Sequence, residues 1–276
     1  MTFLNKNFIG LLALLLLGSA CSEYQKALKS DDLALKTKVA EKLYNDKNYK
    51  KSVRLFEQIE PKYRGRPQGE RVSYFYATNL YYLKDYIMAG YQLERFTSAY
   101  PRSEKVEEVA LMAGKSYYYL SPKYSIDKSD TRTALDKLQA LINMYPKSEF
   151  VEEANTLYQE LAGKLERKEF EIAKQYNKIS QYPAAIKAFD LFLSEHPGSS
   201  FREEALYYRV IAAFNYAENS IQVRQLDRYK ETRDDYNKLA GSIQESIYLE
   251  KLKTIINKTN AQIERLQLLS DNSNSQ

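Results

Sequence analysis

Three pairs of adjacent glutamates are the side chains whose type and spacing could support chemistry. They are Glu107-Glu108, Glu152-Glu153 and Glu203-Glu204. Neighbouring carboxylates can serve as a general acid and a general base. Each pair, however, follows a copy of the same short phrase, so the three pairs occupy equivalent positions. We therefore interpret them as charges in or near the first turn of three helices, where negative charge favours the helix dipole.

The phrase consists of an aromatic residue, Pro, a variable residue and Ser. It reads Tyr100-Pro101-Arg102-Ser103, and it returns at residues 145–148 and 196–199. Pro cannot continue a helix, and Ser can accept a hydrogen bond from the free N–H groups of the next helix. Each copy therefore predicts the end of one helix, a tight turn and the start of another. A unit that recurs every few tens of residues indicates stacked helical repeats.

His196 is the only histidine, and it stands where the other copies of the phrase carry Tyr100 and Tyr145. We expect it to have a structural role. The sequence shows no group of His, Cys, Asp and Glu at metal-ligand spacing, no Gly-rich loop for phosphate and no nucleophile in a recognisable setting. We therefore expect no catalytic residue, no metal and no cofactor. Such a chain is expected to act by binding and not as an enzyme.

Cys21 is the only cysteine, and it follows an apolar leader. The apolar run is shorter than the roughly 20 residues that span a bilayer, so it fits a secretory signal peptide. Residues 17–21, Leu-Gly-Ser-Ala-Cys, resemble the lipobox of bacterial lipoproteins, although Gly18 replaces the usual Leu. The resemblance implies a lipid on Cys21, and Ser22 implies the outer membrane. The alternative is an ordinary signal peptide cut near Ala20, which would leave a free thiol.

The charge of the chain is mild and evenly spread. Charged residues make up 28% of the sequence with mixed sign, and the net charge of +5 becomes +4 if Lys6 leaves with the leader. This pattern indicates a solvated helical surface and gives no reason to expect a nucleic-acid partner. The chain has 25 Tyr and no Trp. We expect most tyrosines to pack between helices and some to line a binding surface.

Apolar residues recur at helical spacing, which predicts an all-α protein with almost no strand. After Tyr49, a small residue follows three positions later at Ser52 and an aromatic residue four further on at Phe56. This spacing resembles the tetratricopeptide repeat, in which small residues let antiparallel helices cross closely. The resemblance implies a right-handed solenoid of about five tetratricopeptide-like helix pairs with a C-terminal capping helix.

The segments of the chain can be assigned from this pattern. Residues 150–181 predict one long helix, or two helices with a break near Gly163, and residues 121–130 predict an insertion. We expect a signal peptide at 1–20, a lipid-anchored linker at 21–32, five repeats at 33–217, a C-terminal helical extension at 218–269 and a disordered tail at 270–276.

In tetratricopeptide arrays the first helices of successive pairs line a concave groove. This geometry places six tyrosines and two cations along one surface: Tyr44, Arg71, Tyr74, Tyr81, Tyr82, Lys115, Tyr118 and Tyr119. Aromatic faces beside cations suit an extended peptide, particularly one that ends in an aromatic residue and a carboxylate. The alternative is that half of these tyrosines pack against the neighbouring second helix.

Residues 168–176 and 182–186 carry a more specific resemblance. Together with the lipobox, the segment that begins at Asp85-Tyr86, the insertion and the repeated phrase, they resemble the BamD family, also called ComL. This family comprises lipoprotein subunits of the β-barrel assembly machinery. The resemblance covers roughly residues 33–217 and fades after Glu218. It implies a lipid-anchored scaffold on the periplasmic face of the outer membrane.

The resemblance also implies partners. These are a BamA-like barrel subunit, other subunits of the assembly machinery, and the C-termini of unfolded outer membrane proteins. Substrate would bind near the tyrosines, and the barrel subunit would dock near residues 188–204. The alternatives are a tetratricopeptide lipoprotein scaffold for cell-wall enzymes, a SusD-like nutrient-binding lipoprotein, and a hydrolase with an unrecognised site. SusD-like proteins are much longer and rich in Trp, which disfavours that alternative.

Overall fold

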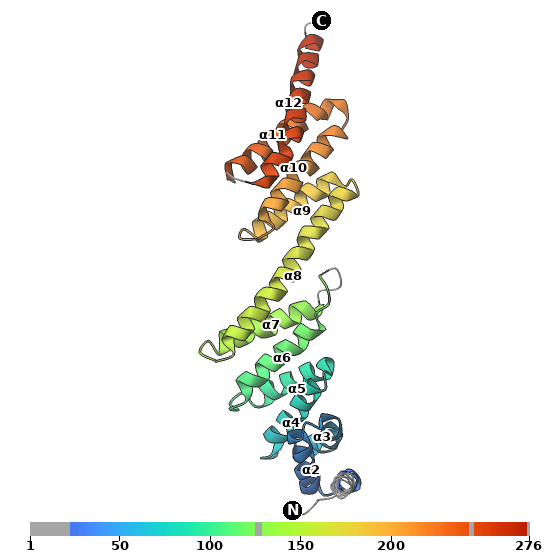
Figure 1. Ribbon diagram of the computed structural model, residues 1–276, viewed down its shortest axis with the longest axis vertical. Coiled ribbons are helices and arrows are strands. Elements are labelled where there is room, and N and C mark those ends of the chain that lie inside the picture. Colours follow the sequence, from blue (N-terminus) through green and yellow to red (C-terminus); the bar gives the residue numbers. More distant parts are fainter. Residues whose placement is uncertain (1–22, 125–128, 243–245, 275–276) are drawn as a thin grey trace, which may run out of the picture. The chain divides into compact units, whose positions relative to one another are not determined.

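The computed structural model describes residues 23–124, 129–242 and 246–274, and the regular structure in these residues is entirely helical (Figure 1). No strand occurs in the described part of the chain, as the helical spacing of the apolar residues predicted. The helices are α2 (Leu33–Asn45), α3 (Tyr49–Tyr63), α4 (Gly69–Tyr82), α5 (Tyr86–Ala99), α6 (Val106–Leu120), α7 (Ser129–Met144), α8 (Val151–Lys178), α9 (Tyr182–Glu195), α10 (Arg202–Glu218), α11 (Gln222–Ser242) and α12 (Ile247–Asn274).

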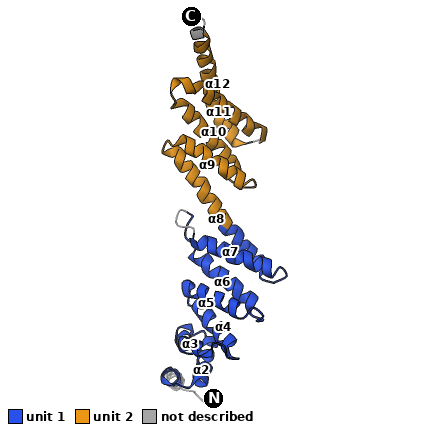
Figure 2. Cartoon of the chain, turned by 180° about the vertical axis from the view of Figure 1, so that it is seen from behind, with its two compact units in different colours: residues 1–161 blue, residues 162–276 orange. Residues whose placement is uncertain are grey.

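The chain divides into two compact units, residues 1–161 and residues 162–276 (Figure 2). In unit 1, each helix from α2 to α6 packs against the next one along the chain. In unit 2, α9 packs on α10, α10 on α11, and α11 on α12. This order confirms an all-α solenoid of tetratricopeptide-like helix pairs. α8 is one continuous helix, so the alternative of a break near Gly163 is wrong.

The three copies of the repeated phrase form the same turn. The Ser N–H donates to the carbonyl of the residue before Pro, at 3.0 Å from Ser103 to Tyr100, 2.9 Å from Ser148 to Tyr145 and 3.1 Å from Ser199 to His196. Each Ser Oγ accepts the N–H two residues later, directly before the helix begins. The glutamate pairs lie in the first turns of α6, α8 and α10, as expected. The phrase therefore ends one helix and starts the next in all three places.

Small side chains lie where the second helices begin. Ser52, Ala89 and Ala185 each stand three residues after the first residue of a second helix, and all three are fully buried. The residues four positions further on, Phe56, Leu93 and Phe189, are also fully buried. This repetition shows why the Tyr49 spacing predicted closely crossing helices: the small residue permits close approach and the large residue fills the space behind it.

The two ends of the chain differ from the expected segments. Residues 23–29, expected in a linker, are helical, and Tyr24 and Ala27 are buried in the core of unit 1. α11 lies beyond residue 217, where we expected the fifth repeat to end, and it packs on α10 as the second helix of that pair. α12 covers the apolar faces of α10 and α11, as expected of a capping helix. It continues to Asn274, so residues 270–274 of the expected disordered tail are helical.

Candidate functional site

The tyrosines predicted to line the groove form one connected set of aromatic rings in unit 1. Neighbouring ring centroids along this set lie between 4.6 and 6.4 Å apart, which is the range of favourable aromatic contacts. We call this set the tyrosine surface; it comprises Tyr44, Tyr49, Tyr74, Phe75, Tyr81, Tyr82, Tyr86, Tyr118 and Tyr119. The structure thus brings together all six predicted tyrosines.

The tyrosine surface repeats one contact from pair to pair. Tyr49, the first residue of α3, stacks on Tyr82 of α4, with ring centroids 4.9 Å apart and an interplanar angle of 19°. Tyr86, the first residue of α5, stacks in the same way on Tyr119 of α6, at 4.6 Å and 26°. Because the contact recurs, the tyrosines at the start of α3 and α5 each orient a tyrosine of the following first helix. The place of Tyr49 and Tyr86 in this surface was not predicted, although the two residues occupy equivalent positions in the sequence.

Exposure divides the predicted tyrosines into two groups. Tyr82 is 44% exposed and Tyr119 is 49% exposed, although each ring stacks on a neighbouring tyrosine. Tyr44, Tyr74, Tyr81 and Tyr118 are only partly exposed and also pack against neighbouring rings. All six predicted tyrosines thus contact neighbouring rings, and the lining of a peptide groove by Tyr82 and Tyr119 stays a prediction.

Burial has an electrostatic consequence for the inner tyrosines. It raises the pKa of Tyr44, Tyr74 and Tyr81 well above the usual value for phenol, chiefly because the charged form loses hydration. A hydrogen bond to Glu160 raises the pKa of Tyr118. The hydroxyl groups of Tyr74 and Tyr118 donate hydrogen bonds to glutamates. Tyr74 donates in this way to Glu108, at 3.2 Å between Oη and Oε1.

The two predicted cations are already paired with carboxylates. The guanidinium of Arg71 donates to both oxygens of Glu41, at 2.6 and 2.8 Å, and lies 5.6 Å from the ring centroid of Phe75. The ammonium of Lys115 donates to Glu153 at 2.6 Å. A peptide carboxylate at either cation must therefore share it with a glutamate or displace the glutamate. The spacing of residues in the sequence does not reveal this competition, because the partners lie 30 and 38 residues away along the chain.

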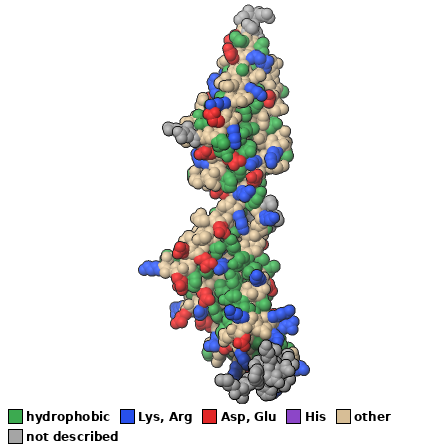
Figure 3. All heavy atoms as spheres, in the orientation of Figure 1, with side chains coloured by type: hydrophobic (Ala, Val, Ile, Leu, Met, Phe, Trp, Pro, Cys, Tyr) green, Lys and Arg blue, Asp and Glu red, His purple; other side chains and the backbone are tan. Residues whose placement is uncertain are grey.

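The partners of the groove residues follow a regular pattern. The second glutamate of each pair reaches the preceding first helix: Glu108 to Tyr74, Glu153 to Lys115, and Glu204 to Lys174 of unit 2. The predicted charges at helix starts thus also connect successive first helices. In unit 1 this arrangement gives the tyrosine surface an acidic margin. Figure 3 shows a face of unit 1 on which hydrophobic side chains gather over α5 to α7, with acidic side chains to one side.

Unit 2 presents a different surface on α8 and α9. Ile172 and Tyr176 lie on α8 and are 41% and 38% exposed, Ile179 directly follows the end of α8 and is 52% exposed, and Leu191 of α9 is 56% exposed. Ile172 and Leu191 line the same shallow hollow, together with Ala188 and Phe192. We call Ile172, Tyr176, Ile179 and Leu191 the α8–α9 apolar surface. It overlaps the region near residues 188–204 that the family resemblance assigns to a partner.

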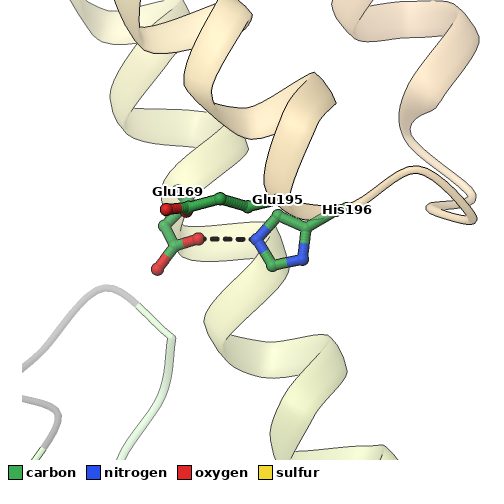
Figure 4. A group of neighbouring side chains, drawn as sticks. All are labelled: Glu169, Glu195 and His196. Carbon is green, nitrogen blue, oxygen red and sulfur yellow. Dashed lines mark hydrogen bonds and ion pairs between the residues drawn. The ribbon is translucent and has the colours of Figure 1, made fainter.

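His196 lies at the end of α9, and its position accords with a structural role. Its Nε2 atom lies 2.8 Å from an oxygen of Glu169 on α8, and its ring packs 5.1 Å from the ring of Phe192 (Figure 4). Glu195 stands beside it. Sequence analysis found no metal-ligand spacing because Glu169 is 27 residues away from His196 along the chain and is brought close only by helix packing.

Cys21 and the rest of the leader lie outside the described residues. In the part of the chain that the structure describes, no helix combines the length and the apolar composition needed to cross a membrane.

Comparison with known proteins gives one family. A family model described as outer membrane lipoprotein (YfiO) matches residues 31–224. Similar curated relatives include three proteins named outer membrane protein assembly factor BamD. The one from Caulobacter vibrioides is 26% identical over 170 residues, which is 60% of this chain and 54% of the relative. The one from Pasteurella multocida is 25% identical over 171 residues, covering 58% and 65%. The one from Rickettsia prowazekii is 24% identical over 165 residues, covering 60% and 66%.

The matched region therefore spans about half to two thirds of the length of these relatives. A solved structure from a study of designed cyclic homo-oligomers aligns with 96% of the chain at 14% identity, but its TM-score of 0.20 supports no argument.

Proposed function

This chain belongs to the YfiO family of outer membrane lipoproteins, and from that premise we propose that it is a scaffold for outer membrane protein assembly. The name of the curated relatives supports this role. The observation that carries the proposal is the tyrosine surface, which is continuous across three first helices and exposes Tyr82 and Tyr119. It suits the recognition of an extended chain by stacking and needs no catalytic step.

The ligand of the tyrosine surface is the C-terminal segment of an unfolded outer membrane protein. An aromatic side chain of the peptide stacks on Tyr82 or Tyr119, because rigid aromatic rings give contact area at low entropic cost. The peptide carboxylate accepts hydrogen bonds from Arg71 or Lys115, in place of Glu41 or Glu153. Since a terminal carboxylate must compete with those glutamates, aromatic stacking supplies the affinity and the cation supplies orientation.

Site-specific crosslinking tests this assignment. A photoreactive amino acid replaces Tyr119 in one variant and Tyr91 in the other. Tyr91 is a matched control, since it is 56% exposed in unit 1 and lies outside the tyrosine surface. We expect the variant at residue 119 to capture a C-terminal peptide of a barrel protein and the variant at residue 91 not to do so. Equal capture at both positions would remove the site assignment.

The partner of the α8–α9 apolar surface is the BamA-like barrel subunit. Four large apolar side chains are exposed there on α8, on α9 and in the turn between them, and such a patch is typical of a protein interface. We expect Leu191→Lys to reduce co-purification of the barrel subunit from detergent extracts by at least about tenfold, since it places a charge in an apolar contact. Ile221→Lys is the control, because Ile221 is 70% exposed elsewhere in unit 2.

The same extracts separate the rival functions. Recovery of peptidoglycan enzymes in place of a barrel subunit would support a cell-wall scaffold, and recovery of a glycan porter would support a nutrient-binding lipoprotein. The lipid is tested at the proposed acceptor, Cys21. Labelled palmitate is expected in the wild-type chain and not in Cys21→Ser, whereas label in both would show that the acceptor lies elsewhere.

A further inference from the structure

Three potential metal ligands meet in unit 2 at the junction of α8 and α9. Ligand atoms of Glu169, Glu195 and His196 all lie within 4.8 Å of one another. Figure 4 shows the carboxylate of Glu169 facing the imidazole ring, with the carboxylate of Glu195 beside that of Glu169. Like charges at this separation repel each other, and a cation between them would relieve the repulsion. We propose that these three side chains form a binding site for a single divalent transition-metal ion, with Zn²⁺ as the ion that fits best.

The ligand types select the class of ion. An imidazole nitrogen with two carboxylate oxygens suits Zn²⁺, whereas Mg²⁺ and Ca²⁺ take oxygen ligands only. Zn²⁺ holds ligands at about 2.1 Å, so ligand atoms in a tetrahedral site lie about 3.4 Å apart. Nε2 of His196 and Oε2 of Glu169 are 2.8 Å apart and need to separate slightly. Glu195 is exposed, so its side chain can rotate to complete three ligands, and water takes the fourth position.

The position of the imidazole is well defined before any ion binds. The backbone N–H of His196 donates to the carbonyl of Phe192 at 2.9 Å, and the two rings lie 5.1 Å apart. Phe192 itself is buried, with 2% of its surface exposed. The nitrogen ligand is therefore held by the turn of the repeated phrase and by the core of unit 2. An ion bound there links the end of α9 to α8.

The three ligand positions can be compared with the equivalent positions of a repeat in unit 1. Ser199 donates to Glu166, and Ser103 of unit 1 donates to Glu70; both glutamates lie 33 residues before the serine. This shared register places Ser73, Ala99 and Tyr100 at the positions of Glu169, Glu195 and His196. The equivalent place in unit 1 therefore has no metal ligand in any of the three positions. The ligands belong to one repeat and are not a general consequence of the phrase.

Zinc titration of the processed chain tests the proposal. The protein is solubilised in detergent, stripped with a chelator and purified without a polyhistidine tag, and binding of ZnCl₂ is followed by calorimetry. The variants Glu169→Ser, Glu195→Ala and His196→Tyr each introduce the residue that unit 1 carries, so the repeat fold should tolerate them. Glu231→Ala, which removes an exposed carboxylate elsewhere in unit 2, is the control.

We expect one ion to bind per wild-type chain and to Glu231→Ala with equal affinity. Each of the three ligand variants is expected to bind at least tenfold more weakly. Because the chain has one histidine, zinc should also shift the only imidazole signals in its NMR spectrum. Equal affinity in wild type and His196→Tyr, or no saturable binding by wild type, would overturn the proposal. Circular dichroism confirms folding, and Glu195→Ala, which changes an exposed side chain, decides the matter if His196→Tyr is unstable.

Discussion

The two units build the same helix pairs with different aromatic residues. In unit 1 the rings of the first helices belong mainly to tyrosines, which continue from the core out to exposed Tyr82 and Tyr119. In unit 2 the central rings are Phe170, Phe189 and Phe192, all buried, and the exposed apolar residues are mostly aliphatic. One repeat architecture thus exposes tyrosine rings in one unit and mostly aliphatic side chains in the other. The residues at equivalent positions, and not the fold, separate the two surfaces for which we propose different partners.

The largest expected difference between the units appears at high pH. Burial raises the pKa of Tyr44, Tyr74 and Tyr81, and it raises the pKa of Tyr117 to about 12. A raised pKa in the folded state means that the contribution to stability is complete below the unfolded pKa of about 10. It is lost as the pH rises through the folded pKa, because the unfolded chain releases its protons first.

Unit 1 is therefore expected to unfold between about pH 10 and pH 12, before unit 2, which has fewer such tyrosines: Tyr207, Tyr229 and Tyr248. The loss of helical circular dichroism should occur in two steps, and tyrosinate absorbance should rise with the first. Tyr44→Phe and Tyr81→Phe should move the first step to higher pH. A single step that these variants leave unchanged would contradict the comparison.

Removing the central ring of unit 2 tests whether the units are energetically separate. Phe170 is 1% exposed and contacts the rings of Phe189, Phe192 and Phe201. Phe170→Ala should lower the free energy of unfolding of unit 2 by about 3–5 kcal/mol, through lost burial and a cavity. Hydrogen exchange should show faster exchange in α9 and α10 and little change in α2 to α5. A uniform increase along the whole chain would show that the units unfold together.

Two glycines, one in each unit, differ in how closely other atoms pack around them. A Cβ atom at Gly69 would lie 2.6 Å from the backbone oxygen of Tyr63, whereas one at Gly163 of α8 would meet nothing within 4 Å. Gly69→Ala should destabilise unit 1 by about 1–3 kcal/mol, because backbone must move. Gly163→Ala should stabilise the chain by up to about 1 kcal/mol, since Ala favours an exposed helix position. Thermal denaturation measures both, and stabilisation by Gly69→Ala would contradict this packing.

The smallest expected effect on stability concerns a buried hydroxyl group that the first helix pair has and that the pairs with Ala89 and Ala185 lack. Ser52 Oγ donates to the carbonyl of Ala40 at 2.8 Å and accepts from Asn79 at 3.1 Å. The equivalent residues are Ala89 and Ala185. Ser52→Ala should cost about 1 kcal/mol, because Asn79 keeps its hydrogen bond to Phe75 but loses the one to Ser52. Ala89→Ser, which adds a hydroxyl at the equivalent place, is the reciprocal variant, and chemical denaturation measures both.

Most of the fold could be predicted from local features of the sequence. The phrase at residues 100–103 and its copies predicted three helix junctions, because Pro and Ser act through neighbouring backbone groups. The Tyr49 spacing predicted close helix crossings, since each period of a helix brings the same face to the core. The ends of the chain were less predictable. Tyr24 and Ala27 are buried by contact with distant residues, and no local pattern marks residues 23–29 as part of the core.

The residues that make up the candidate site could be predicted from the sequence, but the partners of its charged side chains could not. First-helix tyrosines could be placed on one surface from the repeat alone. The partners of Arg71 and Lys115 could not, because Glu41 and Glu153 come from neighbouring first helices and are selected by side-chain direction. The contact between Glu169 and His196 could not be predicted for the same reason. Contacts between successive helices depend on rotation about each helix axis, which sequence spacing fixes only approximately.

The docked segment at residues 23–29 determines how freely the proposed anchor can move. Glu23 forms an ion pair with Lys42 at 2.8 Å, and the ammonium of Lys51 lies 5.5 Å from the ring centroid of Tyr24. Only residue 22 separates Cys21 from this segment, and one extended residue spans at most about 3.6 Å. An acyl chain on Cys21 would thus be joined to the folded segment by almost no linker. The first helix pair would then lie close to the bilayer surface. A peptide that binds unit 1 would therefore bind near the lipid headgroups.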